Sequence, residues 1–211
     1  MSYDEFNITN TDNAILQGKL GAAEFFAASS FEYDESFLLC KSWLLEVGSM
    51  TKRFESLGMS VTVYPHVEQF IDLSSNALNL PCGVYPEGRY WQRDITLYAN
   101  RQPWLIARTL IPEVTLFDNN QKLIDLGTIP LGRYLFSHPG LIRSKLEIAR
   151  ISIELSSLSE QLQSYLVWMA SASKRVNLWG RRSHLLINGY PLQLVELFLP
   201  HSPLYTLHAD K

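Results

Sequence analysis

A glutamate lies in the apolar register of a predicted β-strand near the end of the chain. The strand spans residues 192–199, and its alternation puts Glu196 on the same face as Leu194 and Phe198. An unpaired carboxylate is costly to bury, so this side chain needs a partner or serves chemistry. The chemistry open to a carboxylate is proton transfer or the binding of a hydroxyl group.

Two arginines occupy similar positions in two earlier predicted strands, residues 89–98 and 104–111. Alternation places Arg93 and Arg108 among the apolar side chains of these strands. The expected neighbours are Trp91, Ile95 and Leu97 for the first arginine, and Trp104, Ile106 and Leu110 for the second. One interpretation is a structural ion pair, with aliphatic stems that reach toward water. The other is a closed pocket for a small dianion that also carries a hydroxyl group.

The elements that must position these charges are two predicted hairpins. Asn188 and Gly189 supply the positive φ angles of a tight turn that leads into strand 192–199. The two earlier strands are predicted to turn at residues 99–102, and Pro112 closes the second of them. Both arginines and the glutamate are therefore expected on one β-sheet.

Two predicted helix starts add backbone donors. Ser49 is a suitable N-cap for a helix over residues 50–57, and Pro130 suits the first turn of a second helix. The first amides of a helix lack intrahelical partners, so the amides of Met50 and Leu131 are candidate donors. A carboxylate docked at the second of these amides would be stabilised. The alternative interpretation is that these helix starts face water.

The rest of the chain is predicted in coarser outline. Residues 34–47 form a predicted helix, residues 60–64 a strand, and residues 66–87 an irregular segment. Residues 142–174 are predicted as one long helix with an apolar stripe at spacings of three and four residues. The stripe is expected to pack in the core, or to be a docking face if the domain is complete without it. It consists of Leu155, Leu158, Leu162, Tyr165, Leu166 and Met169.

The bulk composition indicates one domain with a sizeable core. Of 211 residues, 46% are hydrophobic and 12% aromatic. A net charge of −3 does not favour nucleic acid as a partner. The two cysteines are too few for a disulfide framework and are expected to be reduced. We expect a cytoplasmic protein, because the N-terminal residues lack signal-peptide features and no apolar run approaches the roughly 20 residues of a membrane span.

The sequence offers no familiar motif for a metal ion or an organic cofactor. The five histidines show no metal-ligand spacing. The chain contains no G-x-S-x-G elbow, no phosphate-binding P-loop and no dinucleotide fingerprint. We therefore expect a site that works with no metal and no cofactor.

Several blocks of sequence resemble those of the chorismate pyruvate-lyase family, in the same order. The resemblance covers most of residues 36–205. The blocks are SMTKRFE at 49–55, RYWQR at 89–93, PWL at 103–105 followed by RT at 108–109, PLGRYLF at 130–136, LWGRRS at 178–183, ELFLP at 196–200 and SPLY at 202–205.

The resemblance implies an α+β fold, in which helices flank a single antiparallel β-sheet and enclose the ligand under helical flaps. It implies conversion of chorismate to 4-hydroxybenzoate and pyruvate without a cofactor, as the first committed step toward ubiquinone. The domain would span residues 31–211, after an N-terminal appendage of uncertain structure at residues 1–30. A helical insertion is expected at about residues 151–176. The expected state is a monomer, with residues 155–169 as the route to any self-association.

Carried over residue by residue, the resemblance implies that Arg93 and Glu196 are the catalytic residues. The amides of Met50 and Leu131 would also contact the substrate, and Arg108 would lie near its enolpyruvyl side. Our hypothesis is that Arg93 holds the ring carboxylate together with the Leu131 amide, while Arg108 faces the enolpyruvyl carboxylate.

In the same hypothesis, Glu196 holds the C4 hydroxyl together with the Met50 amide. The glutamate either removes the C4 hydrogen or only fixes the reactive conformation. The alternative function is an effector-sensing domain of the same fold, which would bind an aromatic acid without turning it over.

Overall fold

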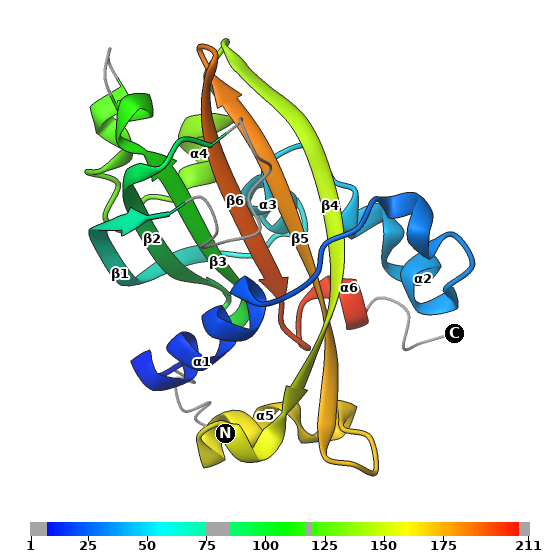
Figure 1. Ribbon diagram of the computed structural model, residues 1–211. Coiled ribbons are helices and arrows are strands. Elements are labelled where there is room, and N and C mark those ends of the chain that lie inside the picture. The colour runs from blue at the N-terminus through cyan, green and yellow to red at the C-terminus, as the bar shows by residue number, and fades with distance from the viewer. Residues whose placement is uncertain (1–7, 75–84, 117–119, 207–211) are drawn as a thin grey trace.

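The fold is one antiparallel β-sheet with helices on both faces, as expected for the α+β class. The computed structural model describes residues 8–74, 85–116 and 120–206. Within these ranges the sheet has the strand order β1-β2-β3-β6-β5-β4 (Figure 1). The strands are β1 (Val61–Leu73), β2 (Gly88–Ala99), β3 (Gln102–Pro112), β4 (Leu141–Glu154), β5 (Arg175–Ile187) and β6 (Tyr190–Phe198).

Short helices connect and cover these strands. The α-helices are α1 (Asn10–Gly21), α2 (Glu35–Leu44), α3 (Met50–Glu55), α4 (Leu131–Leu135), α5 (Glu160–Leu166) and α6 (Pro203–Thr206). The 3-10 helices are η1 (Ala28–Phe31), η2 (Glu113–Leu116), η3 (Asn120–Leu123), η4 (Leu155–Ser157) and η5 (Val167–Met169).

Both predicted hairpins are confirmed. Asn188 and Gly189 join β5 to β6 with φ angles of 52° and 87°. Asn100 and Arg101 join β2 to β3 with φ angles of 47° and 68°. Two successive positive φ angles are typical of the turn whose twist matches that of the flanking strands. Pairing of β3 with β6 joins the two hairpins and so brings the strands of Arg93 and Glu196 into one sheet.

The long helix predicted over residues 142–174 is wrong. Residues 141–154 form β4, the edge strand, which pairs with β5 along its whole length. Arg143, Lys145 and Glu147 follow one another at alternate positions of this strand, which is how edge strands commonly carry charge. Pairing with β5 overrides the local helical spacing of the apolar residues, and helix begins only at η4 and α5.

The strand predicted at residues 60–64 is longer than expected. β1 continues to Leu73, with an irregularity between Pro65 and Val67. The irregular structure predicted for residues 66–87 is therefore wrong for residues 66–73, and residues 75–84 lie outside the described residues. The bulge restarts the pairing with β2, which a strict period of two does not reveal.

Two hydrophobic cores lie on the two faces of the sheet. The first contains side chains of α2, α3 and α4, including Phe37, Phe54 and Leu131. The second contains α1, α5 and the outer half of β4. Figure 1 shows α1 in front of the sheet, with α3 and α4 behind it. Because both faces are covered, apolar neighbours alone do not reveal which face a strand residue occupies.

The stretch predicted as an N-terminal appendage contributes to the second core. Leu16 and Leu20 of α1 are buried there, and Gly21 is the last residue of the helix, where it does not weaken the interior. The Asp12 carboxylate accepts a hydrogen bond of 2.8 Å from the Ser159 amide, which links α1 to the segment before α5.

The apolar stripe of residues 155–169 packs mostly in the same core. Its buried members are Leu155, Leu158, Leu162, Tyr165 and Leu166. Val167 and Trp168 remain exposed beside it. Packing is therefore the correct interpretation for the stripe, and any self-association through this segment would rely on those two exposed side chains.

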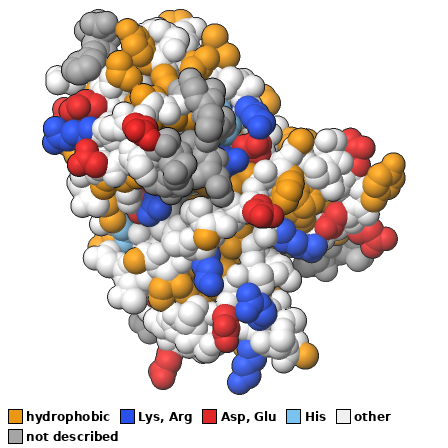
Figure 2. All heavy atoms as spheres, viewed as in Figure 1, with side chains coloured by type: hydrophobic (Ala, Val, Ile, Leu, Met, Phe, Trp, Pro, Cys, Tyr) orange, Lys and Arg blue, Asp and Glu red, His pale blue; other side chains and the backbone are white. Residues whose placement is uncertain are grey.

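The surface carries both signs of charge. On the face that Figure 2 presents, Lys and Arg side chains are interspersed with Asp and Glu. Such mixed charge does not create the single-sign field that attracts a polyanion. Among the described helices, none is long and apolar enough to cross a bilayer.

Candidate active site

Arg93 and Glu196 line one cavity on the first face of the sheet. Both side chains are buried, with 2% and 3% of their surface exposed. The empty space between its walls is about 450 Å³ when the solvent at its mouth is included. Its walls include Thr51, Ile95, Leu97, Leu105, Ala107, Thr109, Pro130, Gly132, Phe136, Arg181 and Leu194.

The strand register sets how the two charges face each other. Arg93 of β2 pairs with Thr109 of β3, and Glu196 of β6 pairs with Ala107 of β3. Neighbouring strands lie about 4.8 Å apart, so the two backbones are separated by roughly 10 Å with β3 between them. At this separation, the side chains of Arg93 and Glu196 can reach groups at opposite ends of one six-membered ring.

The Arg93 guanidinium donates three hydrogen bonds through two of its nitrogens, and its third nitrogen is left without a partner among the described residues. Its Nε donates to Glu68 Oε1 at 2.8 Å, and its Nη2 donates to the carbonyls of Gly127 and Ile129, just before α4. Its Nη1 is buried without a hydrogen-bond partner among the described residues. A buried guanidinium nitrogen without an acceptor is uncommon, and a ligand carboxylate would supply one.

Glu196 forms a buried ion pair with Arg181. The Arg181 Nε lies 2.6 Å from Glu196 Oε2, and the two side chains are 1% and 4% exposed. Arg181 Nη1 donates to the carbonyl of Glu46 at 2.8 Å, between α2 and α3. This pairing fixes the position of the carboxylate, and removal of either partner would leave the other charge buried without a counter-charge.

Arg181 was missed by the sequence reasoning, although a signal was present. Antiparallel pairing counted outward from the two-residue turn at Asn188–Gly189 sets Arg181 opposite Glu196, as the structure shows. The first of the two interpretations of the buried charges, a structural ion pair, is therefore correct for Glu196. The second interpretation, a pocket, is compatible with the ion pair, because Arg181 and Glu196 both line the cavity.

The two predicted helix starts are confirmed. Met50 and Leu131 are the first residues of α3 and α4, and both line the cavity. The Ser49 hydroxyl caps α3 by accepting from the Lys52 amide. A Cβ atom on Gly132 would lie 2.6 Å from Ser49 Oγ, so the start of α4 can pack against the start of α3 because residue 132 is a glycine.

Arg108 does not join this cavity. The register of β2 and β3 shifts between Leu97 and Tyr98, and a shift of one residue moves every following side chain to the other face. Without that bulge, pairing counted from the turn would set Arg93 opposite Arg108. With it, Arg108 pairs with Asp94 and donates to both carboxylate oxygens, at 2.8 and 2.7 Å. The expected position of Arg108 near the enolpyruvyl side is therefore wrong.

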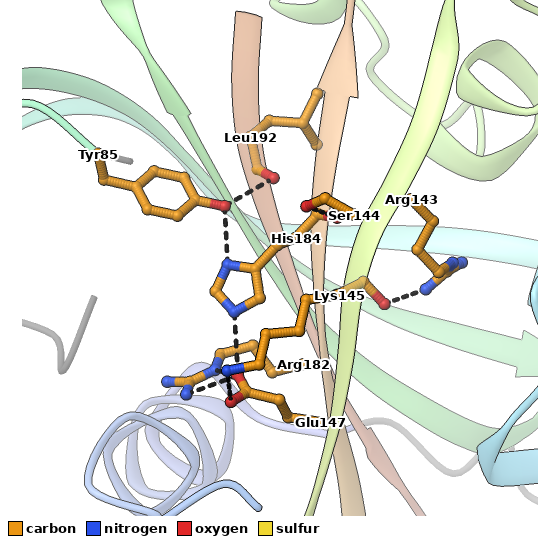
Figure 3. A network of polar contacts seen from close by, with 9 residues as sticks. Tyr85, Arg143, Ser144, Lys145, Glu147, Arg182, His184 and Leu192 are labelled. Atoms are coloured by element: carbon orange, nitrogen blue, oxygen red, sulfur yellow. Dashed lines mark hydrogen bonds and ion pairs between the residues drawn. The ribbon is translucent and has the colours of Figure 1, made fainter. Parts of the chain in front are cut away.

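The second face has its own hollow and its own polar network. Arg108 and Arg182 line the hollow between the sheet and α1. Figure 3 shows the network, in which His184 accepts or donates between the Tyr85 hydroxyl, at 3.0 Å, and Glu147 Oε2, also at 3.0 Å. Burial lowers the pKa of His184, although the hydrogen bond to Glu147 opposes this effect.

Glu147 is the anionic centre of that network. Burial by itself would raise the pKa of its carboxyl group, but hydrogen bonds from Lys145, His184 and Arg182 outweigh burial and hold the pKa at about 2. Glu147 therefore ties the edge strand β4 to β5 as a carboxylate at neutral pH.

Comparison with known proteins gives a consistent result. A family model described as chorismate lyase matches residues 28–209. A probable chorismate pyruvate-lyase of Bartonella henselae is 42% identical over 169 residues, covering 79% of this chain and 82% of the relative. A chorismate pyruvate-lyase of Yersinia enterocolitica is 42% identical over 168 residues, covering 78% and 83%.

Among solved structures, similar folds occur in proteins of low sequence identity. The effector domain of PhnF from Mycobacterium smegmatis matches with a TM-score of 0.50 at 16% identity, covering 74% of this chain and 90% of that domain. PhnF of the same organism matches with a TM-score of 0.51 at 14% identity, covering 89% and 93%. These similarities concern the fold alone.

Proposed function

The chain belongs to the chorismate lyase family, and we propose that it removes pyruvate from chorismate to leave 4-hydroxybenzoate. The observation that carries this proposal is one cavity in which a buried Arg93, whose Nη1 has no partner among the described residues, shares the walls with a buried Glu196. These two groups complement a carboxylate and a hydroxyl, the groups at the two ends of the product.

The substrate supplies most of the driving force. The C3–O bond of chorismate breaks, and its electron pair leaves with the enolpyruvyl group. The C4–H electron pair becomes the new ring double bond, and the released proton ends on the enolate, which becomes pyruvate. Because the ring becomes aromatic, the protein needs chiefly to orient the substrate, exclude water and stabilise the leaving charge.

Arg93 is proposed to bind the ring carboxylate. Its planar guanidinium suits that geometry, and its other nitrogens are already fixed by Glu68 and by the carbonyls before α4. The Leu131 amide, at the start of α4, would provide a second donor to the same carboxylate. Because Arg93 also holds the chain before α4, binding and the position of this helix are coupled.

Glu196 is proposed to bind the C4 hydroxyl, with the Met50 amide as a donor to the same oxygen. Its Oε2 is engaged by Arg181, so the carboxylate is oriented before the substrate arrives. We assign it a positioning role toward the hydroxyl, with the C4 hydrogen aligned for transfer to the departing enolate.

The proposal extends to the conditions and context of the reaction. It requires no redox cofactor, because elimination with aromatisation moves no electrons to an acceptor, and we propose that it works without a metal ion, as expected from the sequence. We also propose a cytoplasmic monomer whose product feeds quinone synthesis, as the family resemblance implies. Small-molecule substrate binding agrees with the enclosed cavity, whose walls are mostly apolar.

The direct test is the formation of 4-hydroxybenzoate from chorismate, followed by absorbance, with a chelator present. We expect turnover by the purified protein and a loss of roughly 10- to 100-fold in kcat/KM for Arg93→Gln, the cost of a hydrogen bond to a charged group. Full activity in Arg93→Gln would contradict the site. Binding of 4-hydroxybenzoate without any turnover of chorismate would favour the effector-sensing alternative.

A further inference from the structure

The proposed reaction leaves one substrate group without a partner, the carboxylate on the enolpyruvyl group. Arg108 was its expected partner, but Arg108 lies on the opposite face of the sheet and pairs with Asp94. Arg181 is engaged by Glu196 and by the carbonyl of Glu46. A second cation is therefore needed on the first face, where negative charge grows as the enolate leaves.

We infer that Arg143 binds this second carboxylate, an assignment that rests on the proposed function and adds a substrate-binding residue to it. Arg143 belongs to β4 and pairs with Leu185 of β5, whose side chain packs in the first core. Directly opposed residues of antiparallel strands share a face. Figure 3 shows Arg143 extending away from the His184 and Glu147 network of the second face.

The guanidinium of Arg143 reaches the wall of the cavity. It donates to the Ser183 hydroxyl, and Ser183 pairs with Leu194, which lines the cavity. Its Cζ lies 5.4 Å from the ring centroid of Phe136, another lining residue. Arg143 thus lies beside the cavity wall at the β4–β5 end, while Arg93 lines the β2 end.

Two donors of Arg143 are left for a ligand. Its Nε and Nη2 are buried and make no hydrogen bond within the described part of the chain. Two buried guanidinium nitrogens without acceptors are costly, and a bidentate carboxylate would satisfy both. Burial, and then the nearby Arg181 charge, lower the pKa of Arg143 to about 10, so the group is a cation at neutral pH.

The experiment compares two ligands that differ in this carboxylate. Chorismate carries it and 4-hydroxybenzoate does not. For Arg143→Gln we expect kcat/KM for chorismate to fall roughly 10- to 100-fold, while the Kd for 4-hydroxybenzoate, measured by calorimetry, changes less than about twofold. Arg143→Lys should recover part of the loss, because it keeps the charge and loses the bidentate geometry.

Arg150→Gln is the matched control, since Arg150 lies on the same strand and pairs with Asp34 at the surface. It should leave both quantities unchanged. Unchanged turnover in Arg143→Gln, or equal losses for both ligands, would overturn the inference. If the wild-type protein binds chorismate without turnover, the proposed function fails, and calorimetry with chorismate still tests Arg143. If Arg143→Gln does not fold, Arg143→Lys with both ligands decides the question.

Discussion

Glu196 is the residue whose proposed role depends most on a neighbouring side chain. Its carboxylate receives the Arg181 guanidinium at 2.6 Å, and neither side chain reaches solvent to any extent. A carboxylate held in this way is well placed to accept a hydrogen bond from a hydroxyl group and is oriented by its partner. A general base for the C4 hydrogen would need its free oxygen aimed at carbon instead.

The corresponding prediction concerns Glu196→Gln. The amide keeps the shape and one acceptor, so we expect KM to rise while kcat falls less than about tenfold. Loss of a general base would instead lower kcat by roughly 10²- to 10⁴-fold. Steady-state kinetics with chorismate separate the two results, and a fall of the larger size would refute the positioning role.

Stability must be followed in the same variant. Arg181 would lose its buried counter-charge, which typically costs about 3–5 kcal/mol of folding free energy. The kinetics are therefore measured well below the thermal midpoint of the variant, determined by circular dichroism.

Some residues of the proposed site could be predicted from a few neighbouring residues in the sequence, and others could not. Arg93 and Glu196 were predicted because each interrupts an apolar alternation within its own strand. Met50 and Leu131 were predicted because the Ser49 cap and the proline at residue 130 are local signals of a helix start. Arg143 was not predicted, because its strand had been assigned as helix and its face depends on pairing with β5.

At the scale of elements, the two helix starts over the cavity depend on one close contact. Gly132, the second residue of α4, lies so near Ser49 that a Cβ atom would stand 2.6 Å from the serine Oγ. That separation is shorter than a hydrogen bond, so a larger residue must displace either the Ser49 hydroxyl that caps α3 or the whole of α4. Both amides proposed to bind substrate belong to these helices.

We therefore predict that Gly132→Ala weakens 4-hydroxybenzoate binding by about tenfold or more, with the sheet intact by circular dichroism. Adding Ser49→Gly removes the clashing oxygen and should restore much of the affinity, because glycine is only a few tenths of a kcal/mol worse as an N-cap. Calorimetry on the single and double variants is the measurement. Wild-type affinity in Gly132→Ala would show that the helix spacing does not matter.

The elements themselves were predictable where they depend on local chemistry. The turns at Asn100–Arg101 and Asn188–Gly189 and the helix starts of α3 and α4 need only a few adjacent residues. β4 was not predictable in this way, because its apolar residues also fit a helical spacing. Only the hydrogen bonds offered by β5 select the extended form.

At the scale of the whole molecule, Glu147 links stability to pH. Its pKa of about 2 in the folded state lies below the ordinary value of 4.5, because Lys145, His184 and Arg182 bind the carboxylate. A depressed folded-state pKa contributes stability that is present above the unfolded pKa and is lost as pH falls toward the folded one. We therefore expect this contribution to disappear between about pH 4.5 and pH 2.

The measurement is urea unfolding of wild type and Glu147→Gln at several pH values. The variant should be clearly less stable at pH 7, and the gap should close as the pH approaches 2. A gap that stays constant with pH would mean that Glu147 stabilises the β4–β5 pair through packing rather than through its charge.

The sequence by itself determined the antiparallel hairpins, the two helix starts and the two buried charges of opposite sign, because each is encoded within a few neighbouring residues. It also carried enough similarity to identify the family. Which face Arg108 occupies was decided only by the tertiary structure. A single bulge between Leu97 and Tyr98 shifts the register by one residue. The free energy of that shift depends on how the side chains pack against both covered faces of the sheet.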